Sequence, residues 1–158
     1  MTNTDNKFIE QALQLATTNV KQGGGPFGAV IVKDGKVVGT GQNSVTVIND
    51  PTAHAEVMAI REACKKLNNF NLEGCVIYSS CEPCPMCMAS CLWARLDRVT
   101  FAADRYQAAE VGFDDLAFYK LFEEIPVSKW ETPVEHIKVD NPIAPFTAWN
   151  ENEDKVEY

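Results

Sequence analysis

The chain has 158 residues, a length that suits one domain with a hydrophobic core of its own. Its net charge of −8, from 14 basic and 22 acidic residues, disfavours a long nucleic acid as partner, because phosphate backbones require concentrated Lys and Arg. Apolar residues make up 46% of the chain and no run approaches the roughly 18 apolar residues of a membrane span. We therefore expect a globular protein with no membrane partner.

Six cysteines and a polar N-terminus bear on the compartment. Residues 1–11 lack the basic start and the apolar stretch of a signal peptide, so we expect a cytoplasmic protein. In a reducing compartment, clustered cysteines indicate metal binding or catalysis before disulfides. Four of the six cysteines gather in residues 79–91, which makes this stretch a candidate functional site.

Hydrophobic periodicity predicts the elements of the N-terminal half. Residues 5–22 place apolar side chains at helical spacing, and a run of glycines followed by a proline ends this helix. Residues 27–43 form two β-rich runs around Asp34-Gly35, which is a strong signal for a hairpin. Residues 55–67 return to helical spacing.

The middle of the chain continues this alternation. Residues 74–80 are a short apolar run, typical of a buried strand. Pro85 fits the first turn of a helix that runs to about residue 95, and residues 98–104 favour another strand. Strands that alternate with helices predict an α/β protein with helices on both faces of one sheet, and the hairpin makes that sheet mixed.

The pattern is less regular after residue 104. Residues 108–125 indicate a loop and a helix, broken by a glycine and then by a proline. Residues 132–140 are predicted to form a last strand. The end of the chain, residues 141–158, combines aromatic side chains with a charged tail.

Two clusters carry side chains that can bind metal. His54 and Glu56 lie in "TAHAEVMA", and Cys84 and Cys87 lie in "PCPMC". The two cysteines are three residues apart at a helix start, so their sulfurs share a face, and a helix N-terminus favours the thiolate. A predicted strand separates the clusters, which allows both helix starts to meet at one end of the sheet. Thiolates with one imidazole indicate zinc.

The spacing leaves two kinds of metal site open. Cys81, three residues before Cys84, allows a closed site of three cysteines and His54, which is typical of structural zinc, and an iron–sulfur cluster is a weaker version of the same hypothesis. Catalytic zinc instead keeps three protein ligands and leaves a position for water. Glu56 favours the catalytic site, because a carboxylate beside zinc can shuttle protons, although an acid in a first helical turn also stabilises the helix dipole.

"HAE" followed by "PCPMC" resembles the zinc-dependent nucleobase and nucleoside deaminase superfamily. The resemblance implies that His54, Cys84 and Cys87 bind one zinc ion per chain, with a water or hydroxide in the fourth position. It implies that Glu56 is the catalytic proton shuttle and that Cys81 is not a ligand. The implied fold is a three-layer α/β/α sandwich with a central mixed β-sheet.

A narrower resemblance covers nearly the whole chain. The segments "GGPFGAVIVKDG", "NDPTAHAEV", "SCEPCPMC" and "GFDD", with the end "PFTAW…VEY", are similar to bacterial guanine deaminases of the small, cytidine-deaminase-like type. This resemblance implies a single deaminase domain over residues 1–158. It also implies zinc-dependent hydrolytic deamination of guanine, a free purine base, to xanthine and ammonia in purine catabolism or salvage.

The same resemblance assigns part of a substrate pocket. It implies that Asn43 binds the polar edge of the purine, that Phe27 packs against the ring and that Asp115 accepts hydrogen bonds from the N–H groups of guanine. Trp93, six residues after Cys87, is near enough in sequence to line the pocket. Each of these residues also has a structural interpretation: Asn43 as a turn residue, Phe27 and Trp93 as core residues, and Asp115 as a helix cap.

The C-terminal segment completes this hypothesis. The resemblance implies that residues 141–158, ending in Tyr158, cap the active site, in this family from the partner subunit of a homodimer. Tyr158 has the alternative of being a frayed terminus.

Three other functions stay open at this point. A tRNA adenosine deaminase shares "HAE" and "PCPMC" but needs a basic RNA-binding surface, whereas the last eight residues carry four acids and one lysine. Deamination of another aminated heterocycle, such as cytosine, adenine, a triazine or a pterin, is not excluded by the motifs. A binding module with structural zinc is the alternative that is not an enzyme.

Overall fold

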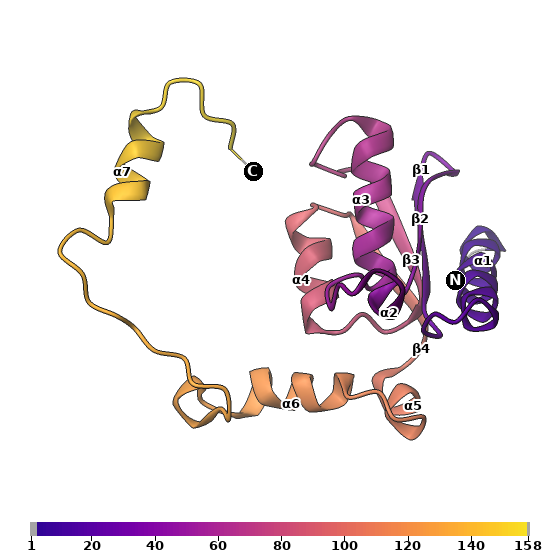
Figure 1. Ribbon diagram of the computed structural model, residues 1–158. Helices are drawn as coiled ribbons and strands as arrows, with labels where there is room; N and C mark the ends of the chain where they lie inside the picture. The colour runs from indigo at the N-terminus through magenta and orange to yellow at the C-terminus, as the bar shows by residue number, and fades with distance from the viewer. Residues whose placement is uncertain (1–2, 158) are drawn as a thin grey trace. The chain divides into compact units, whose positions relative to one another are not determined.

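The computed structural model describes residues 3–157 and divides into two compact units, residues 1–119 and 120–158 (Figure 1). The larger unit contains the sheet. Its elements are α1 (Asn3–Lys21), β1 (Gly28–Lys33), β2 (Lys36–Gln42), α2 (Val45–Ile48), α3 (Ala55–Leu67), β3 (Cys75–Cys81), α4 (Pro85–Trp93), β4 (Arg98–Ala103) and α5 (Arg105–Glu110). Helix α6 (Asp115–Glu124) crosses the boundary, and the smaller unit adds η1 (Val127–Lys129) and α7 (Ala144–Glu151).

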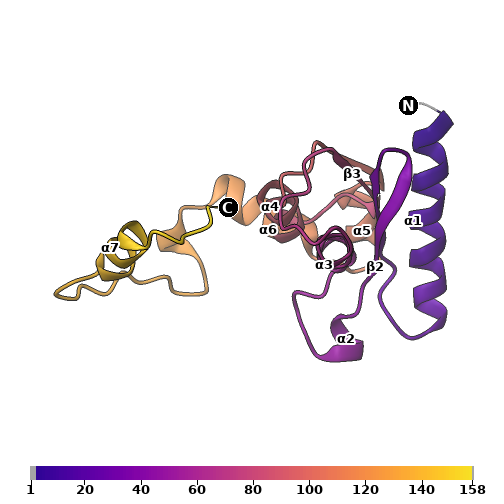
Figure 2. The same ribbon diagram turned by 90° about the horizontal axis from the view of Figure 1, so that it is seen from above.

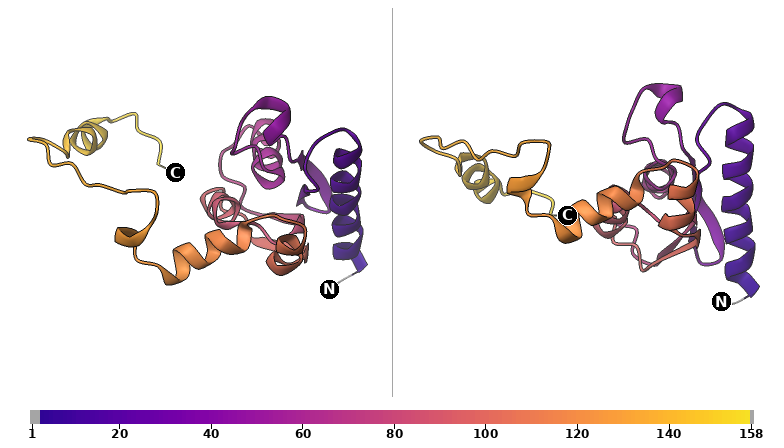
Figure 3. Two further views of the ribbon diagram at one scale, coloured as in Figure 1. Left: turned by 60° about the horizontal axis from the view of Figure 1, so that its bottom comes forward. Right: turned by 90° about the horizontal axis from the view of Figure 1, so that it is seen from below.

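The four strands form one mixed sheet in the order β2-β1-β3-β4. Strand β1 pairs antiparallel with β2 and with β3, whereas β3 and β4 are parallel. Helix α1 covers one face of the sheet, and α3 and α4 cover the other (Figures 1 and 2). The views in Figure 3 show the same separation from two further directions. The three-layer α/β/α sandwich with a mixed sheet is therefore confirmed.

Strand β1 divides the core between the two faces of the sheet. Ala29 and Ile31 are fully buried in the cluster that includes α3 and α4, whereas Val30 and Val32 pack with Phe8 of α1. This alternation follows from the two-residue period of a strand, in which successive side chains point to opposite faces. Because both faces are covered, the strand is apolar throughout.

Glycines in β2 bring α3 unusually close to the sheet. A Cβ atom at Gly39 would lie 2.5 Å from the carbonyl oxygen of Ala59, and one at Gly41 would overlap the carbonyl oxygen of Ala55. The helix side of this contact is an alanine row at i, i+4 spacing, from Ala55 through Ala59 to Ala63, all fully buried. The contact fixes the depth of the first turn of α3, where the predicted metal ligands begin.

The hairpin predicted at Asp34-Gly35 is confirmed. Asp34 has φ of 50° and Gly35 has φ of 72°, so the two turn residues both occupy the left-handed region. A two-residue turn of this kind matches the right-handed twist of the flanking strands. The predicted helix at residues 55–67 is also confirmed as α3.

The prediction of a strand at residues 132–140 is wrong, because this described segment has no regular secondary structure. Its apolar residues Val134, Ile137 and Val139 alternate partly as in a strand but are 60%, 76% and 60% exposed. A strand requires a paired neighbour, and the described part of residues 120–158 contains none. Helix α7, which the sequence did not predict, follows instead. No helix in residues 3–157 has the length and apolar character needed to cross a membrane.

Candidate metal centre and active site

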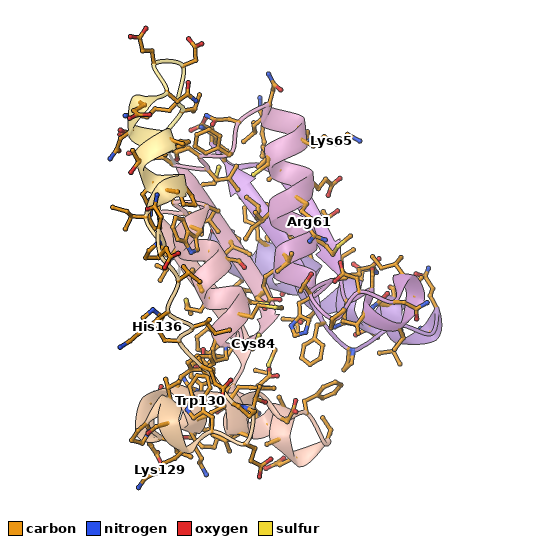
Figure 4. The ribbon with its side chains drawn as sticks, turned by 60° about the vertical axis from the view of Figure 1, so that its left-hand side comes forward. Arg61, Lys65, Cys84, Lys129, Trp130 and His136 are labelled. Atoms are coloured by element: carbon orange, nitrogen blue, oxygen red, sulfur yellow. The ribbon has the colours of Figure 1, made fainter. Side chains whose placement is uncertain are left out.

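Two helices begin side by side at one end of the sheet, and each begins at a residue that can bind metal. His54 is the N-cap of α3 and has an extended backbone, with φ of −69° and ψ of 158°. Cys84 is the N-cap of α4, with φ of −60° and ψ of 168°, and Pro85 opens the helix after it. Figure 4 labels Cys84 at this end of α4. Two residues at i and i+2 within a helix would point to nearly opposite sides. Because His54 precedes the first helical residue and has an extended backbone, its side chain and that of Glu56 can face the same site.

The loop before His54 is shaped by its own hydrogen bonds. Asp50 accepts hydrogen bonds from the backbone N–H of Thr52 at 2.8 Å and from its hydroxyl at 2.7 Å. Arg61, which extends from α3 (Figure 4), approaches the other oxygen of Asp50 at 3.5 Å. Hydrogen bonds from Thr52 lower the pKa of the Asp50 carboxyl, so it is ionised at neutral pH.

His54, Cys84 and Cys87 form a group whose ligand atoms all lie within 4.8 Å of one another. The Nδ1 atom of His54 is 3.6 Å from Sγ of Cys84 and 3.5 Å from Sγ of Cys87. Bonds of about 2.3 Å from zinc to sulfur and about 2.0 Å from zinc to nitrogen, at a tetrahedral angle, separate the two ligand atoms by about 3.5 Å. The three side chains therefore fit a tetrahedral zinc site with one position left for a ligand that is not from this group.

The electrostatics of the two thiols also suit a metal. A hydrogen bond from Cys87, followed by one from His54, lowers the pKa of the Cys84 thiol to about 4. The pKa of Cys87 is raised because its proton is shared with Cys84 and because the site is buried. A thiolate that forms readily beside an imidazole is the donor set that zinc prefers.

Glu56 lies in the first turn of α3 and is buried, with 5% of its surface exposed. The hydroxyl of Ser79, on β3, donates to its Oε1 atom at 3.0 Å. Burial raises the pKa of the Glu56 carboxyl above its ordinary value. A carboxyl group held beside the group of His54, Cys84 and Cys87 is placed to accept and to release a proton.

A cavity of about 250 Å³ opens onto this group. Cavities for drug-sized ligands usually measure about 300–1,000 Å³, so this one suits a bare nucleobase better than a larger substrate. Residues from five separate stretches of the larger unit line it: Gly25, Phe27, Asn43, Val45, Thr46, His54, Glu56, Glu82, Cys84, Phe113, Asp114 and Asp115.

Two of the predicted pocket residues, Phe27 and Asn43, line the cavity and are tied to each other. The backbone N–H of Asn43 donates to the carbonyl of Phe27 at 3.1 Å. The ring of Phe27 meets the ring of Phe113 edge to face, with centroids 4.7 Å apart. Asn19 of α1 is buried, and its amide donates at 2.8 Å to the carbonyl oxygens of both Gly25 and Asn43. This bidentate contact fixes the two loops that form one wall of the cavity.

The acidic pair of "GFDD" forms another part of the wall. Asp115, the first residue of α6, is half-buried, whereas Asp114 is exposed. Burial raises the pKa of Asp115, with the neighbouring Cys84 adding to the effect. Asp115 has no hydrogen-bond partner among residues 3–157, so its oxygens face the cavity as free acceptors.

Two predicted pocket residues are not found at this cavity. Trp93, the last residue of α4, is 62% exposed and is not among the residues of one chain that line the cavity, so its role in the pocket stays a prediction. Tyr158 lies outside the described residues.

Cys81 is not part of the metal-binding group among the described residues. Its thiol faces the carbonyl of Asp104 at 3.8 Å, and burial raises its pKa to about 11, so it stays protonated. The closed site of three cysteines and one histidine, left open by the spacing, is therefore not the arrangement in the structure.

Several residues of the site had no usable signal in the sequence. Asn19, Ser79 and Glu82 act through hydrogen bonds across distant elements, which periodicity does not predict. The capping box at the start of α5, in which Asp104 and Gln107 bond each other's backbone, has a recognisable spacing and would have located that helix.

This fold and this three-residue group define a zinc-binding deaminase domain. Residues 2–103 match the cytidine and deoxycytidylate deaminase zinc-binding region, and the chain belongs to that family. Over 152 residues the chain is 49% identical to the guanine deaminase of Bacillus subtilis, covering 96% of this chain and 97% of the relative. The X-ray structure of the Bacillus subtilis guanine deaminase matches with a TM-score of 0.94 and 47% identity, covering 100% of this chain and 99% of that one.

Other members of the family match over a shorter range. A tRNA-specific adenosine deaminase of Aquifex aeolicus is 45% identical over 96 residues, which is 61% of this chain and 64% of the relative. A structure of guanine deaminase from Nitrosomonas europaea matches with a TM-score of 0.65 and 29% identity, covering 68% of this chain and 63% of that one. These matches cover about two thirds of this chain, whereas the match to the Bacillus subtilis guanine deaminase covers nearly all of it.

Proposed function

We propose that this chain catalyses the zinc-dependent hydrolytic deamination of guanine: guanine and water give xanthine and ammonia. The observation that carries the proposal is the 49% identity to the guanine deaminase of Bacillus subtilis over 96% of the chain. That range extends well beyond residue 103, where the zinc-binding region ends. The relation to tRNA adenosine deaminases does not extend over the chain to the same degree.

We propose that His54, Cys84 and Cys87 are the zinc ligands and that Glu56 is the catalytic residue. Zinc in a site with an open position acts as a Lewis acid that lowers the pKa of a coordinated water toward ~7. Glu56 accepts one proton from the attacking water and delivers it to a ring nitrogen of the purine. It then takes the second proton from the hydroxyl now bound to the 2-position and passes it to the amine, so that the carbon–nitrogen bond breaks, ammonia leaves and the 2-carbonyl of xanthine forms. Ser79 holds one carboxylate oxygen of Glu56 throughout.

The remaining residues of the cavity select the base. We propose that Asp115 accepts hydrogen bonds from the N–H groups of guanine, which an unpaired carboxylate facing the cavity is suited to do. Asn43 binds the polar edge of the purine, and Phe27, fixed by Phe113, packs against the ring. Trp93 has no part in this proposal.

A homodimer with exchanged C-terminal segments is the second part of the proposal. Residues 141–158 of one chain close the cavity of its partner, with Tyr158 at the end. The support is the exposed apolar surface of this region: Ile143 and Phe146 are 62% and 69% exposed within the chain. Apolar side chains grouped in this way usually mark an interaction site. Within this proposal, residues 1–158 act as one deaminase domain, and the cytoplasmic location stays a prediction.

Complementation tests the exchange. A full-length Glu56→Gln chain and a chain truncated after residue 140 are each expected to be inactive. Mixed and refolded together, they form heterodimers in which the intact Glu56 site of the truncated chain is closed by the other chain's segment, and activity returns. If the mixture is no more active than the separate proteins, each segment serves its own chain or none.

A substrate panel tests the reaction itself. The zinc-loaded protein is assayed for ammonia release from guanine, cytosine, adenine and an RNA anticodon stem-loop that carries adenosine. We expect guanine to give the highest kcat/KM. An equal or greater rate on the RNA would overturn the choice of substrate. Stoichiometric zinc with no ammonia release from any of these compounds would favour a structural metal site.

A further inference from the structure

A charged pair links the end of β3 to the start of α5. The Glu82 carboxylate accepts hydrogen bonds from the guanidinium of Arg105 at 2.7 Å and from its backbone N–H at 3.0 Å. The two side chains form an ion pair that is largely shielded from solvent. Glu82 lines the cavity and lies two residues before Cys84. The acid on this side of the cavity is therefore already neutralised by a cation.

Tyr119 on α6 contacts both Arg105 and the loop that carries Glu82. The Arg105 guanidinium carbon lies 3.2 Å from the centroid of the Tyr119 ring, which is a close cation–π contact. The Tyr119 hydroxyl donates to the carbonyl of Pro83 at 2.5 Å. Pro83 is fully buried and directly precedes Cys84. A single side chain thus bonds the backbone next to a proposed zinc ligand and supports the cation that neutralises Glu82.

Tyr119 and Asp115 are four residues apart on α6, so they lie on the same face of the helix, one turn from each other. Asp115 is half-buried, lines the cavity and is the first residue of the helix. The hydrogen bond from Tyr119 therefore joins the turn of α6 next to Asp115 to the loop of Pro83.

We propose that Tyr119, with Arg105 and Glu82, is a positioning residue for substrate recognition. It sets the position of Asp115 relative to the metal-bearing loop and does not touch the reacting atoms. This inference rests on the proposed function, because its effect is read in the binding of guanine. The inference gives different roles to two carboxylates that line the cavity. Glu82 forms an ion pair with Arg105 and supports the loop, whereas Asp115 is available to bind the base.

The Tyr119→Phe substitution removes one O–H donor and keeps the ring beneath Arg105. We expect KM for guanine to rise about tenfold, kcat to change less than about twofold, and zinc content to stay at the wild-type value. The matched control is Tyr106→Phe, which removes the hydroxyl of a tyrosine that is 63% exposed on α5. A change in kcat alone, or a loss of zinc, would show that Tyr119 supports the metal loop instead and would overturn the inference.

A double-mutant cycle with Asp115→Asn tests whether Tyr119 acts through Asp115. If it does, Tyr119→Phe raises KM in the wild-type background but adds less than about twofold in the Asp115→Asn background. Additive effects on KM, or an Asp115→Asn variant with unchanged KM, would overturn the inference. Failure of the proposed function is distinguishable, because the wild-type protein would then release no ammonia from guanine, whatever residue 119 is.

Discussion

The site has two sides that differ in how they are built. The metal side, which consists of His54, Glu56, Cys84 and Cys87, is carried by the first turns of two helices that pack on a buried sheet. The recognition side, which consists of Phe27, Asn43, Phe113, Asp114 and Asp115, comes from loops and from the start of α6. The first is anchored by close backbone packing, and the second by a few hydrogen bonds between distant segments.

In the function that we propose, this difference separates chemistry from specificity. The metal side lies within residues 2–103, which match the zinc-binding region of the family. The recognition side includes residues beyond 103, where the family region ends. One fold can carry different substrate sites around the same reactive group. Changes on the metal side should therefore reduce kcat, and changes on the recognition side should raise KM.

The largest effect is expected at Glu56. Glu56→Gln retains the shape of the side chain and an oxygen that can accept from Ser79, but it cannot transfer protons. We expect kcat for guanine to fall by about 10²–10⁴-fold or more with zinc content unchanged, as measured by steady-state kinetics and metal analysis. Glu10→Gln, at an exposed acid of α1, is the control. A Glu56→Gln enzyme of near-wild-type rate would exclude Glu56 as the proton shuttle.

Asp115 tests the other side of the comparison. Asp115→Asn replaces one acceptor oxygen with a donor, which opposes the donors of guanine, and a lost charge-assisted hydrogen bond costs about 1.5–3 kcal/mol. We expect KM for guanine to rise about 10–100-fold with zinc content unchanged. Asp114→Asn, at the exposed neighbour, should raise KM less. The reverse order of the two effects would assign recognition to Asp114.

Gly41 tests how strictly the packing of α3 fixes the metal side. Gly41→Ala places a Cβ atom against the carbonyl oxygen of Ala55, in the first turn of the helix. Overpacking of this kind typically destabilises a protein by about 1–3 kcal/mol, and displacement of α3 should also weaken zinc binding. Urea unfolding and zinc affinity measure both effects, with Lys36→Ala at the exposed start of β2 as control. A Gly41→Ala protein with the wild-type free energy of unfolding would show that α3 can shift away from β2 without loss of stability, and so that this packing does not fix the metal side.

The smallest effect is the alkaline stability linked to Tyr119. Burial raises the pKa of its phenol, so the folded state holds this proton more tightly than the unfolded state. Its contribution is fully present below the unfolded pKa of about 10 and is lost as pH rises through the higher folded pKa. Unfolding free energies measured between pH 8 and pH 11 should fall less steeply for Tyr119→Phe than for wild type. Parallel curves would contradict the burial of this phenol.

The metal side could be predicted from the sequence because its signals are local. The helix at residues 55–67 follows from its apolar spacing, and Pro85 identifies the start of α4. The exclusion of Cys81 needed more than spacing, since three evenly spaced cysteines fit a closed site equally well. In the structure, Cys81 ends β3 with its thiol toward Asp104, a placement that depends on the sheet.

The recognition side was only partly predictable because it depends on tertiary contacts. Asn43 and Asp115 were expected from the resemblance, and both line the cavity. The buried amide that holds the backbone of Asn43 belongs to Asn19 on α1, 24 residues earlier in the chain. Trp93 was placed in the pocket by its nearness in sequence to Cys87, yet its position at the end of α4 exposes it. The strand expected at residues 132–140 failed because an alternating pattern does not supply a pairing partner.

A zinc titration of guanine turnover tests the central claim most directly. Protein stripped of metal is reconstituted with increasing zinc, and xanthine formation is measured for wild type and for Glu56→Gln. We predict that wild-type activity rises linearly to one zinc per chain and then stays constant, whereas Glu56→Gln binds the same zinc and forms xanthine at least about 10²-fold more slowly. Xanthine formation that is independent of zinc, or equal in the two proteins, would contradict the assignment of this site.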